Sequence, residues 1–460
     1  MAVCDNEVAM ALNKAGWRRV SLALFGCAAF ALAGCTQAAP THQSARSADP
    51  VVRWIQQNAI PLRTVDAGGS DADLARLRQM VGHASIVGLG EETHGTHEFY
   101  ALKARLAEFL IANLGFTTFI MENNWGASQR VDAYINGGSD TIDAVMQAAL
   151  FGSWQTQEYR ALLEWMRAYN ADPAHPTKIH FLGMDIQAVS HSEFDAVAQY
   201  VQQVAPQQAA QVQQLYAPII ANSLPNPYPN YAALGASTKH QYQSQAQQVY
   251  DLLQAHQQSY IQQSSPQSVA LALQNARIIV QFATYFDAAD RQEALARYYQ
   301  RDNFLAENAA WIHEHDAGSA PHSIVWAHDV HIANDTSYSS PDSRNMGGEL
   351  RARYQASYLA MGTTLYQGAF RIYQYPQSFI QQVAAPGRDT YNYTLGQADL
   401  PLYLLDLRNV PPGPVGAWAS GPAVLLNYGL GGEDLSGSGA LSQWFDVIIH
   451  IQKTTPSTLI

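Results

Sequence analysis

The chain has 460 residues, of which 47% are hydrophobic and 14% are charged, and its formal net charge is −12. This length is enough for one large domain or two, each with a sizeable core. The acidic balance and the absence of any basic stretch argue against nucleic acid as a partner. All three cysteines lie in the first 35 residues, which excludes disulfides, cysteine nucleophiles and Cys-ligated zinc from the rest of the chain.

Residues 1–35 have the pattern of a bacterial lipoprotein signal peptide. Basic residues at positions 14, 18 and 19 precede an apolar run at 20–32 that is too short to span a bilayer. The run leads into Leu-Ala-Gly-Cys, which resembles a lipobox and predicts cleavage before Cys35 and lipidation of that residue. Because Thr36 follows, we expect an exported lipoprotein on the periplasmic face of the outer membrane, with 36–48 as its tether. An ordinary secretory peptide with a chance cysteine is the alternative.

Strand and helix patterns alternate from about residue 71 to 190, which predicts parallel βαβ units. Short runs rich in Ile, Val, Phe and Thr read as strands buried on both faces; they are 84–90, 117–121, 179–184 and 323–327. Amphipathic helices are expected at 96–114, where Gly115 ends the helix, and at 157–169, before Asp172 and Pro173. Asp49 and Pro50 predict the N-cap and first position of the first helix.

The composition changes at residue 190. From 192 to 315 the chain is rich in Gln and Ala, and helices are expected at 240–263 and 268–287. We therefore predict an α/β fold with a mainly parallel central sheet flanked by helices. Its catalytic core would comprise 49–190 and 316–460, with 191–315 as an α-helical insertion, or cap. Apolar runs near the end of the chain, at 402–405, 424–426 and 445–449, are expected to complete the sheet.

Each of the four predicted core strands stops at ionisable residues. Glu91 and His94 follow the first strand, Glu122 the second and Asp185 the third, and His328 and His331 follow the fourth. Ligands and chemistry collect beyond the carboxyl ends of the strands in open α/β sheets. We therefore expect these side chains to form one acid/base site. A carboxylate here can orient an imidazole or have its own pKa raised by burial.

Missing motifs narrow the type of reaction. The sequence has no Gly-x-Ser-x-Gly elbow, no Walker A loop, no Gly-x-Gly-x-x-Gly and no His-Glu-x-x-His. What remains is direct attack by an activated water, with a histidine as base and carboxylates that orient it.

At these residues the chain resembles the erythromycin esterase family. The resemblance rests on segments spread from about residue 50 to 450, namely Gly90-Glu91-x-x-His94-Gly95-Thr96-x-Glu98-Phe99, Leu114-Gly115-Phe116-Thr117 with Glu122, Gly183-Met184-Asp185, Arg301-Asp302-x-x-Leu305-Ala306-x-Asn308, Trp326-Ala327-His328-x-x-His331, and Met346-Gly347 with Tyr358 and Gly362. It implies an α/β fold with added helices. It also implies hydrolysis of a small-molecule ester, such as the lactone of a macrolide antibiotic, and hence antibiotic resistance.

The same resemblance assigns roles to residues. His94 looks like the general base, and Glu91 and Glu122 look like its orienting and charge-stabilising partners. His328 and His331 look like the groups that stabilise the oxyanion or protonate the leaving alkoxide. The resemblance also suggests supporting or substrate-contacting roles for four further residues, which are Lys103, Asp185, Arg301 and Glu98. Lys103 stands where the family has arginine, so the planar fork is lost while the charge is kept.

Two alternatives to a cofactor-free ester hydrolase remain open. In the first, a metal-dependent hydrolase or peptidase binds a divalent ion such as zinc among Glu91, His94, Glu122, His328 and His331, because imidazole and carboxylate are also metal ligands. In the second, an envelope lipoprotein keeps the fold as a binding module without catalysis.

The leader generates a direct test. Replacing Cys35→Ser removes the thiol that carries the lipid, so the variant is expected to leave the membrane fraction and to lack the mass of the acyl chains. Fractionation and intact-mass measurement check this. A variant that stays in the membrane fraction with unchanged mass contradicts lipidation at Cys35.

Overall fold

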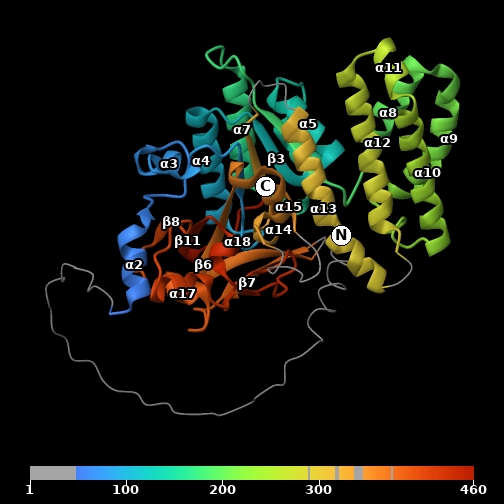
Figure 1. Cartoon of the computed structure of the whole chain (residues 1–460). Coiled ribbons are helices and arrows are strands. Elements are labelled where there is room, and N and C mark those ends of the chain that lie inside the picture. Colours follow the sequence, from blue (N-terminus) through green and yellow to red (C-terminus); the bar gives the residue numbers. More distant parts are fainter. Residues whose placement is uncertain (1–47, 289–290, 316–320, 336–344, 375–376) are drawn as a thin grey trace.

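A nine-stranded sheet forms the centre of the molecule (Figure 1). The structure, a computed structural model, describes residues 48–288, 291–315, 321–335, 345–374 and 377–460. The strand order is β1-β8-β11-β6-β2-β5-β3-β4, and β7 pairs with β6. The strands span β1 Ile60–Pro61, β2 Ile86–Leu89, β3 Thr118–Asn124, β4 His180–Asp185, β5 Ser323–Trp326, β6 Tyr358–Gln374, β7 Gln377–Val383, β8 Leu402–Asp406 and β11 Val447–Thr454.

The middle of the sheet is parallel, as the sequence predicts. β6, β2, β5, β3 and β4 run parallel to their neighbours, as does β11 to β6, while β1, β7 and β8 pair antiparallel. Leu89 of β2 pairs with Trp326 of β5, which pairs with Met121 of β3. These strands therefore reach the same edge at the same level, and the residues that follow them meet there.

Helices cover both faces of this sheet. The helices of the α/β part are α2 Pro50–Asn58, α3 Leu77–Val81, α4 His97–Leu114, α5 Trp125–Ile135, α6 Ile142–Ala149, α7 Gln157–Ala171, α13 Arg291–His315, α14 Asp329–Ile332, α15 Met346–Tyr354, α16 Tyr391–Gly396, α17 Pro414–Ser420 and α18 Leu441–Trp444. Three predicted boundaries are confirmed. Asp49 caps α2 and accepts from Val51 N–H, Gly115 ends α4 at φ 74°, and α7 ends directly before Asp172.

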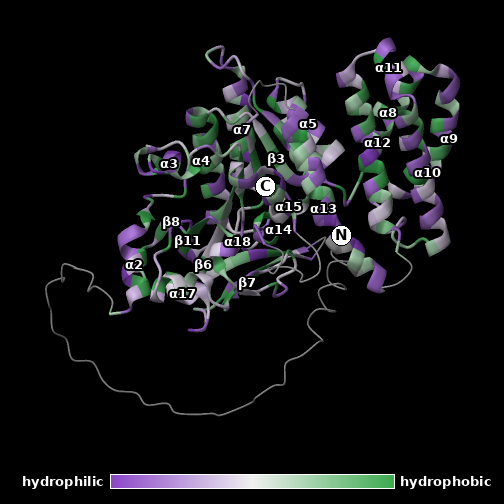
Figure 2. Ribbon diagram, viewed as in Figure 1, coloured by the Kyte–Doolittle hydropathy of each residue, from purple (hydrophilic) through white to green (hydrophobic). Residues whose placement is uncertain are grey.

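The alternation of side chains along the strands separates two hydrophobic cores. Ile120 of β3 packs in one core, while its neighbours Phe119 and Met121 pack in the other. Ile448 and Ile449 of β11 divide in the same way. Because successive side chains point to opposite faces, the continuous apolar runs of the sequence are explained by a sheet that is buried on both sides (Figure 2).

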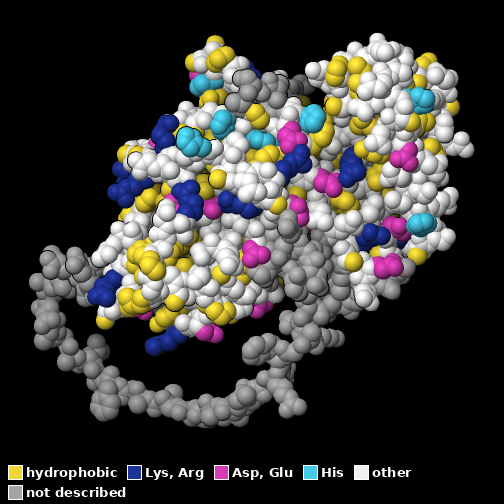
Figure 3. All heavy atoms as spheres, in the orientation of Figure 1, with side chains coloured by type: hydrophobic (Ala, Val, Ile, Leu, Met, Phe, Trp, Pro, Cys, Tyr) yellow, Lys and Arg dark blue, Asp and Glu magenta, His cyan; other side chains and the backbone are white. Residues whose placement is uncertain are grey.

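The Gln-rich segment forms a group of helices. It contains α8 His191–Val204, α9 Pro206–Ser223, α10 Ala236–Ala255, α11 Gln257–Gln263 and α12 Pro266–Phe286, which lie together beside the α/β part (Figure 1). Val249, Leu253 and Phe282 are completely or almost completely buried between these helices. On the face that Figure 3 shows, the surface of this group is mostly uncharged. α13 packs against α12 and also against β3, β4 and α15, so it joins the helical group to the sheet.

The end of the chain departs from the prediction in two places. The runs at 402–405 and 445–449 do join the sheet, as β8 and β11. The run at 424–426 does not, because β9 Ala423–Leu425 pairs only with β10 Gly437–Gly439 in a separate ribbon. The long strand β6 and its hairpin partner β7 were not predicted, since β6 extends as a half-exposed arm beyond the sheet core.

Two features concern the membrane. The predicted leader at 1–35, with Cys35, lies outside the described residues, as does the tether at 36–48 except for its last residue. Among the helices that the structure describes, none combines the length and the apolar character needed to cross a bilayer.

Candidate functional site

The register of the sheet gathers the predicted acid/base residues at one edge. Glu91 and His94 lie in the turn between β2 and α4, Glu122 lies in β3, and His328 caps α14, which contains His331. The sequence predicts that this strand stops at Glu122. In the structure β3 instead continues to Asn124, with a register shift after Met121. Such irregularities re-aim side chains near functional sites, and here Glu122 reaches both His331 and the backbone of His328.

His94 is held as a neutral imidazole. Its Nδ1 lies 3.1 Å from Glu91 Oε1, and because an ionised carboxylate can only accept, Nδ1 donates. Its ring contacts Trp154 edge-on at 4.9 Å and the His328 ring at 4.8 Å. Burial is the main cause that lowers the pKa of His94 to about 4, against the opposite pull of Glu122. Nε2 has no hydrogen-bond partner among the described residues, so its lone pair is available for a proton.

Lys103 supports Glu91 from behind. This residue of α4 is completely buried; its Nζ contacts Glu91 Oε2, lies 3.3 Å from the carbonyl oxygen of Ala327, and sits 4.1 Å above the Trp326 ring. Burial lowers the pKa of Lys103 well below its usual value, although Asp329 and Glu122 oppose this. Both oxygens of Glu91 are therefore engaged, one by His94 and one by Lys103.

Arg301 of α13 holds two strand ends together. Its Nε and one terminal nitrogen donate to the two oxygens of Asp185 at 3.0 and 2.7 Å, and the same terminal nitrogen donates to Glu122 Oε1 at 2.8 Å. All three side chains are buried. A bidentate guanidinium–carboxylate pair fixes orientation as well as charge. Asp185 thus acts on the cluster through Arg301, and its other hydrogen bonds come from Ile186 N–H and Gln187 N–H.

His331 carries a proton between two carboxylates. Its Nδ1 lies 2.7 Å from Asp302 Oδ1, and its Nε2 lies 3.3 Å from Glu122 Oε1. Burial alone would lower the pKa of His331, but Asp302 and Glu122 raise it to about 10. Burial would likewise raise the pKa of Glu122, yet His331 and Arg301 hold it well below its usual value. The raised pKa of His331 and the lowered pKa of Glu122 favour an imidazolium paired with a carboxylate, although Arg301 Nη1 also lies 3.3 Å from His331 Nε2.

His328 has both ring nitrogens engaged. Its Nε2 lies 3.0 Å from the carbonyl oxygen of Tyr428, and its Nδ1 accepts from Val330 N–H at 3.4 Å. The backbone N–H of His328 donates to Glu122 Oε2 at 3.0 Å. Burial and the nearby His94 ring lower the pKa of His328 well below its usual value. These contacts define a neutral imidazole protonated on Nε2.

Two further buried carboxyl groups lie behind the turn. Asp329 accepts from Thr363 N–H at 3.1 and 3.2 Å, and Glu92 accepts from Leu365 N–H and from the Asn392 amide. Burial raises the pKa of Asp329 to about 8 and that of Glu92 well above its usual value. A Cβ at Gly90 would lie 1.9 Å from Asp329 Oδ1. This turn therefore packs directly on the helix that follows β5.

The structure does not bring every predicted residue into the cluster. Glu98 instead accepts from the N–H and hydroxyl of Thr455 at 2.7 Å each, so it ties α4 to the chain after β11. His97, expected to be peripheral, pairs with Glu158 at 2.6 Å and is one-third exposed. Trp154, which ends the short 3₁₀ helix Gly152–Trp154, and Tyr428 were missed, because a single aromatic residue gives no signal of a distant contact.

The fit of a metal ion can be judged from the donor atoms. One ligand atom from each of Glu91, His94 and Glu122 lies within 4.8 Å of the others. However, Glu91 is already engaged on both oxygens and Glu122 accepts from Arg301. His328 and His331 have protein partners on both ring nitrogens. An ion at the three donors would have to share carboxylate oxygens that already accept from His94, Lys103 and Arg301, so these residues are arranged first as a hydrogen-bonded cluster.

Comparisons with known proteins show the family and the fold of the chain. A sequence model of the family described as erythromycin esterase matches residues 111–454. YbfO of Bacillus subtilis (strain 168), named only provisionally as a hydrolase, is 22% identical over 88% of this chain and 92% of its own. A crystal structure titled succinoglycan biosynthesis protein is 30% identical, covers 91% of this chain and all of its own, and has a TM-score of 0.78. The structure of a mutant of the erythromycin esterase EreC in its open conformation has a TM-score of 0.68 and is 16% identical. The match covers 84% of this chain and 95% of the EreC chain.

The charged His331 makes stability depend on pH in a defined direction. Its pKa is raised, so the stabilisation is complete below pH about 6.5 and is lost as pH rises towards 10. Asp302→Asn is expected to lower the free energy of unfolding by about 3 kcal/mol at pH 7, and by less at pH 10, where His331 of the parent is about half deprotonated. Urea unfolding at both values measures this.

Asp143→Asn is the matched control, since its ion pair with Arg160 is exposed and such pairs contribute at most about 1 kcal/mol. An equal loss for Asp302→Asn at both pH values would contradict a protonated His331.

Proposed function

Because the chain belongs to the erythromycin esterase family, we propose that it hydrolyses a carboxylic ester or lactone with a water molecule activated by His94. Family membership supports a hydrolase; the ester bond and the mechanism are our proposal. The observation that carries it is the state of His94, which is neutral, oriented by Glu91 and free at Nε2.

The first step is proton transfer coupled to attack. Water held at His94 Nε2 attacks the carbonyl carbon of the ester, and its proton passes to Nε2. The tetrahedral intermediate then collapses, the bond from carbon to the alkoxy oxygen breaks, and His94 returns the proton to the departing oxygen. The products are a carboxylic acid and an alcohol, and His94 is neutral again. Such general acid–base catalysis contributes about 10² to 10⁴ in rate.

Glu122 is the charged neighbour that favours this proton transfer, whereas Arg301 and His331 themselves lower the pKa of His94. Glu122 raises the pKa of His94, so it stabilises the imidazolium that forms when water is deprotonated. Arg301 and His331 keep Glu122 ionised and in place. A fixed carboxylate aimed at developing charge in a buried site requires no reorganisation during the reaction.

His328 and His331 act in this proposal as positioning residues. Each has both ring nitrogens bound to protein groups. Direct donation to an oxyanion, the role that the family resemblance suggests for them, would require one of these bonds to break when substrate binds. The positive charge of His331 instead acts on Glu122, and the backbone N–H of His328 holds Glu122 in place.

We further propose that the substrate is a small-molecule ester, macrolide-like or other, that no metal is needed, and that the protein acts in the cell envelope as a lipoprotein. The lipobox-like leader supports the last point, and the acidic charge supports the absence of nucleic acid among its partners.

His94→Ala is expected to reduce hydrolysis by a factor of about 10² to 10⁴, because no base remains for the water. Mass spectrometry of candidate esters, macrolides included, incubated with protein measures product. His97→Ala is the matched control and is expected to keep the parental rate, since His97 pairs with Glu158 away from the cluster. Unchanged hydrolysis in His94→Ala would overturn the mechanism, whereas no hydrolysis by the parent of any ester tested would favour the non-catalytic binding module.

Metal removal separates the proposal from the metallohydrolase alternative. After treatment with a chelator and gel filtration, the protein is expected to keep its full rate and to contain less than stoichiometric metal by elemental analysis. Loss of activity that is restored by adding zinc would instead assign Glu91, His94 and Glu122 to a metal.

A further inference from the structure

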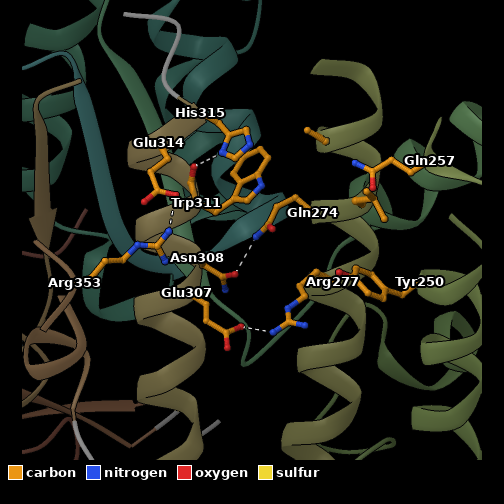
Figure 4. A pocket seen from close by; sticks show the side chains of 12 residues that line it. Tyr250, Gln257, Gln274, Arg277, Glu307, Asn308, Trp311, Glu314, His315 and Arg353 are labelled. Atoms are coloured by element: carbon orange, nitrogen blue, oxygen red, sulfur yellow. Dashed lines mark hydrogen bonds and ion pairs between the residues drawn. The ribbon is translucent and has the colours of Figure 1, made fainter. Parts of the chain in front are cut away.

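A cavity of about 400 Å³ separates the helical group from the α/β part (Figure 4). One wall is formed by residues of α10, α11 and α12, and the other by residues of α13 and α15. This volume falls in the range of roughly 300–1,000 Å³ that small-molecule sites occupy. From its lining we propose that this junction cavity binds a neutral, hydroxyl-rich ring of the saccharide class.

The cavity is separate from the acid/base cluster. α13 contributes Arg301 to the cluster and Trp311 to the cavity. At 1.5 Å per residue these two positions lie about 15 Å apart along the helix. None of the predicted catalytic residues lines the cavity. A ligand here would therefore occupy a second site, and the inference does not depend on the proposed hydrolysis.

An aromatic platform forms one part of the wall. Trp311 stacks on His315 at 4.2 Å with an interplanar angle of 10°, and it meets Trp125 edge-on at 5.5 Å. Trp125 is itself fixed by a hydrogen bond from its ring nitrogen to Asn275 Oδ1 at 3.2 Å. Aromatic rings held in this way offer a rigid surface for the C–H face of a sugar ring, with little loss of side-chain entropy.

The charges of the cavity are balanced. Arg277 pairs with Glu307 at 2.5 Å, and Arg353 pairs with Glu314 at 2.6 Å (Figure 4). To pair with an arginine, an anionic ligand would have to break the ion pair between that arginine and its glutamate. A cationic ligand would have to do the same in order to pair with a glutamate. Neither exchange adds a new charge pair, so an uncharged ligand fits the cavity best.

The remaining walls supply hydrogen bonds in both directions. Gln274 Nε2 donates to Asn308 Oδ1 at 2.9 Å, and Asn308 Nδ2 in turn donates to the carbonyl oxygen of Met184 and to Gln281 Oε1, so the Asn308 amide is fixed within the protein. The amide of Gln257 has no hydrogen-bond partner within the described part of the chain and lies on the cavity wall (Figure 4). Ala270 and Leu273 are the only aliphatic residues of the lining. Amides both donate and accept, as sugar hydroxyls do, and the Gln257 amide is the group that a purely apolar ligand would leave unpaired.

Isothermal titration calorimetry on the full chain tests the proposal. The probes are the neutral disaccharides cellobiose, maltose and lactose, the p-nitrophenyl glycoside of each, and glucuronate as a charged comparator. Binding of a free disaccharide assigns the site to oligosaccharide, and binding of the glycosides alone assigns it to a glycosylated small molecule. Either result supports the saccharide class, provided that glucuronate does not bind.

Two variants locate the binding. Ala270→Trp fills the cavity without removing a polar contact and is expected to abolish binding. Gln257→Ala is expected to weaken it about tenfold, while Gln258→Ala, its exposed neighbour outside the cavity, leaves it unchanged. Circular dichroism melting shows whether each variant is folded. Preference for glucuronate, absence of binding to every neutral probe at millimolar concentration, or binding that folded Ala270→Trp retains would each overturn the proposal.

Discussion

The contact of the Arg301 guanidinium with Glu122 and Asp185 is the constraint on which the candidate site depends. Three charged side chains from α13, β3 and β4 are removed from water here. Charges in such surroundings are tolerated only with well-oriented partners. The planar fork of arginine provides this, since its hydrogen bonds reach both carboxylates at once. It thereby fixes Glu122, the group that the other elements of the site surround.

The three neighbouring imidazoles differ in protonation according to how each one lies relative to this fixed carboxylate. His331 lies between Glu122 and Asp302 and is protonated, whereas His328 and His94 are buried without such a pair and stay neutral. A site with one charged and two neutral histidines can hold an ionised carboxylate and still offer a base. The pKa values are separated by environment alone, as in other acid/base sites. Glu91 then selects the tautomer of His94 that leaves Nε2 open.

Much of this arrangement could be predicted from the sequence, because parallel strands carry their C-terminal residues to one edge. Glu91, Glu122 and His328 each follow a short buried run, and the local pattern was sufficient to group them. Trp154 and Tyr428 could not be found in this way, since they reach the cluster from a short 3₁₀ helix and from the C-terminal part through tertiary contacts alone. The run at 424–426, which forms β9 in the separate ribbon, was expected in the sheet for a related reason, because an apolar run does not specify its partner strand.

Neutron diffraction from a deuterium-exchanged crystal at neutral pD tests the central claim most directly, because it locates the protons on the three imidazoles. The account predicts deuterium on both ring nitrogens of His331, on Nε2 alone of His328, and on Nδ1 alone of His94. A doubly deuterated His94, or a His331 with deuterium on a single nitrogen, would contradict it. The first result would leave no base for water, and the second would remove the charge that holds Glu122.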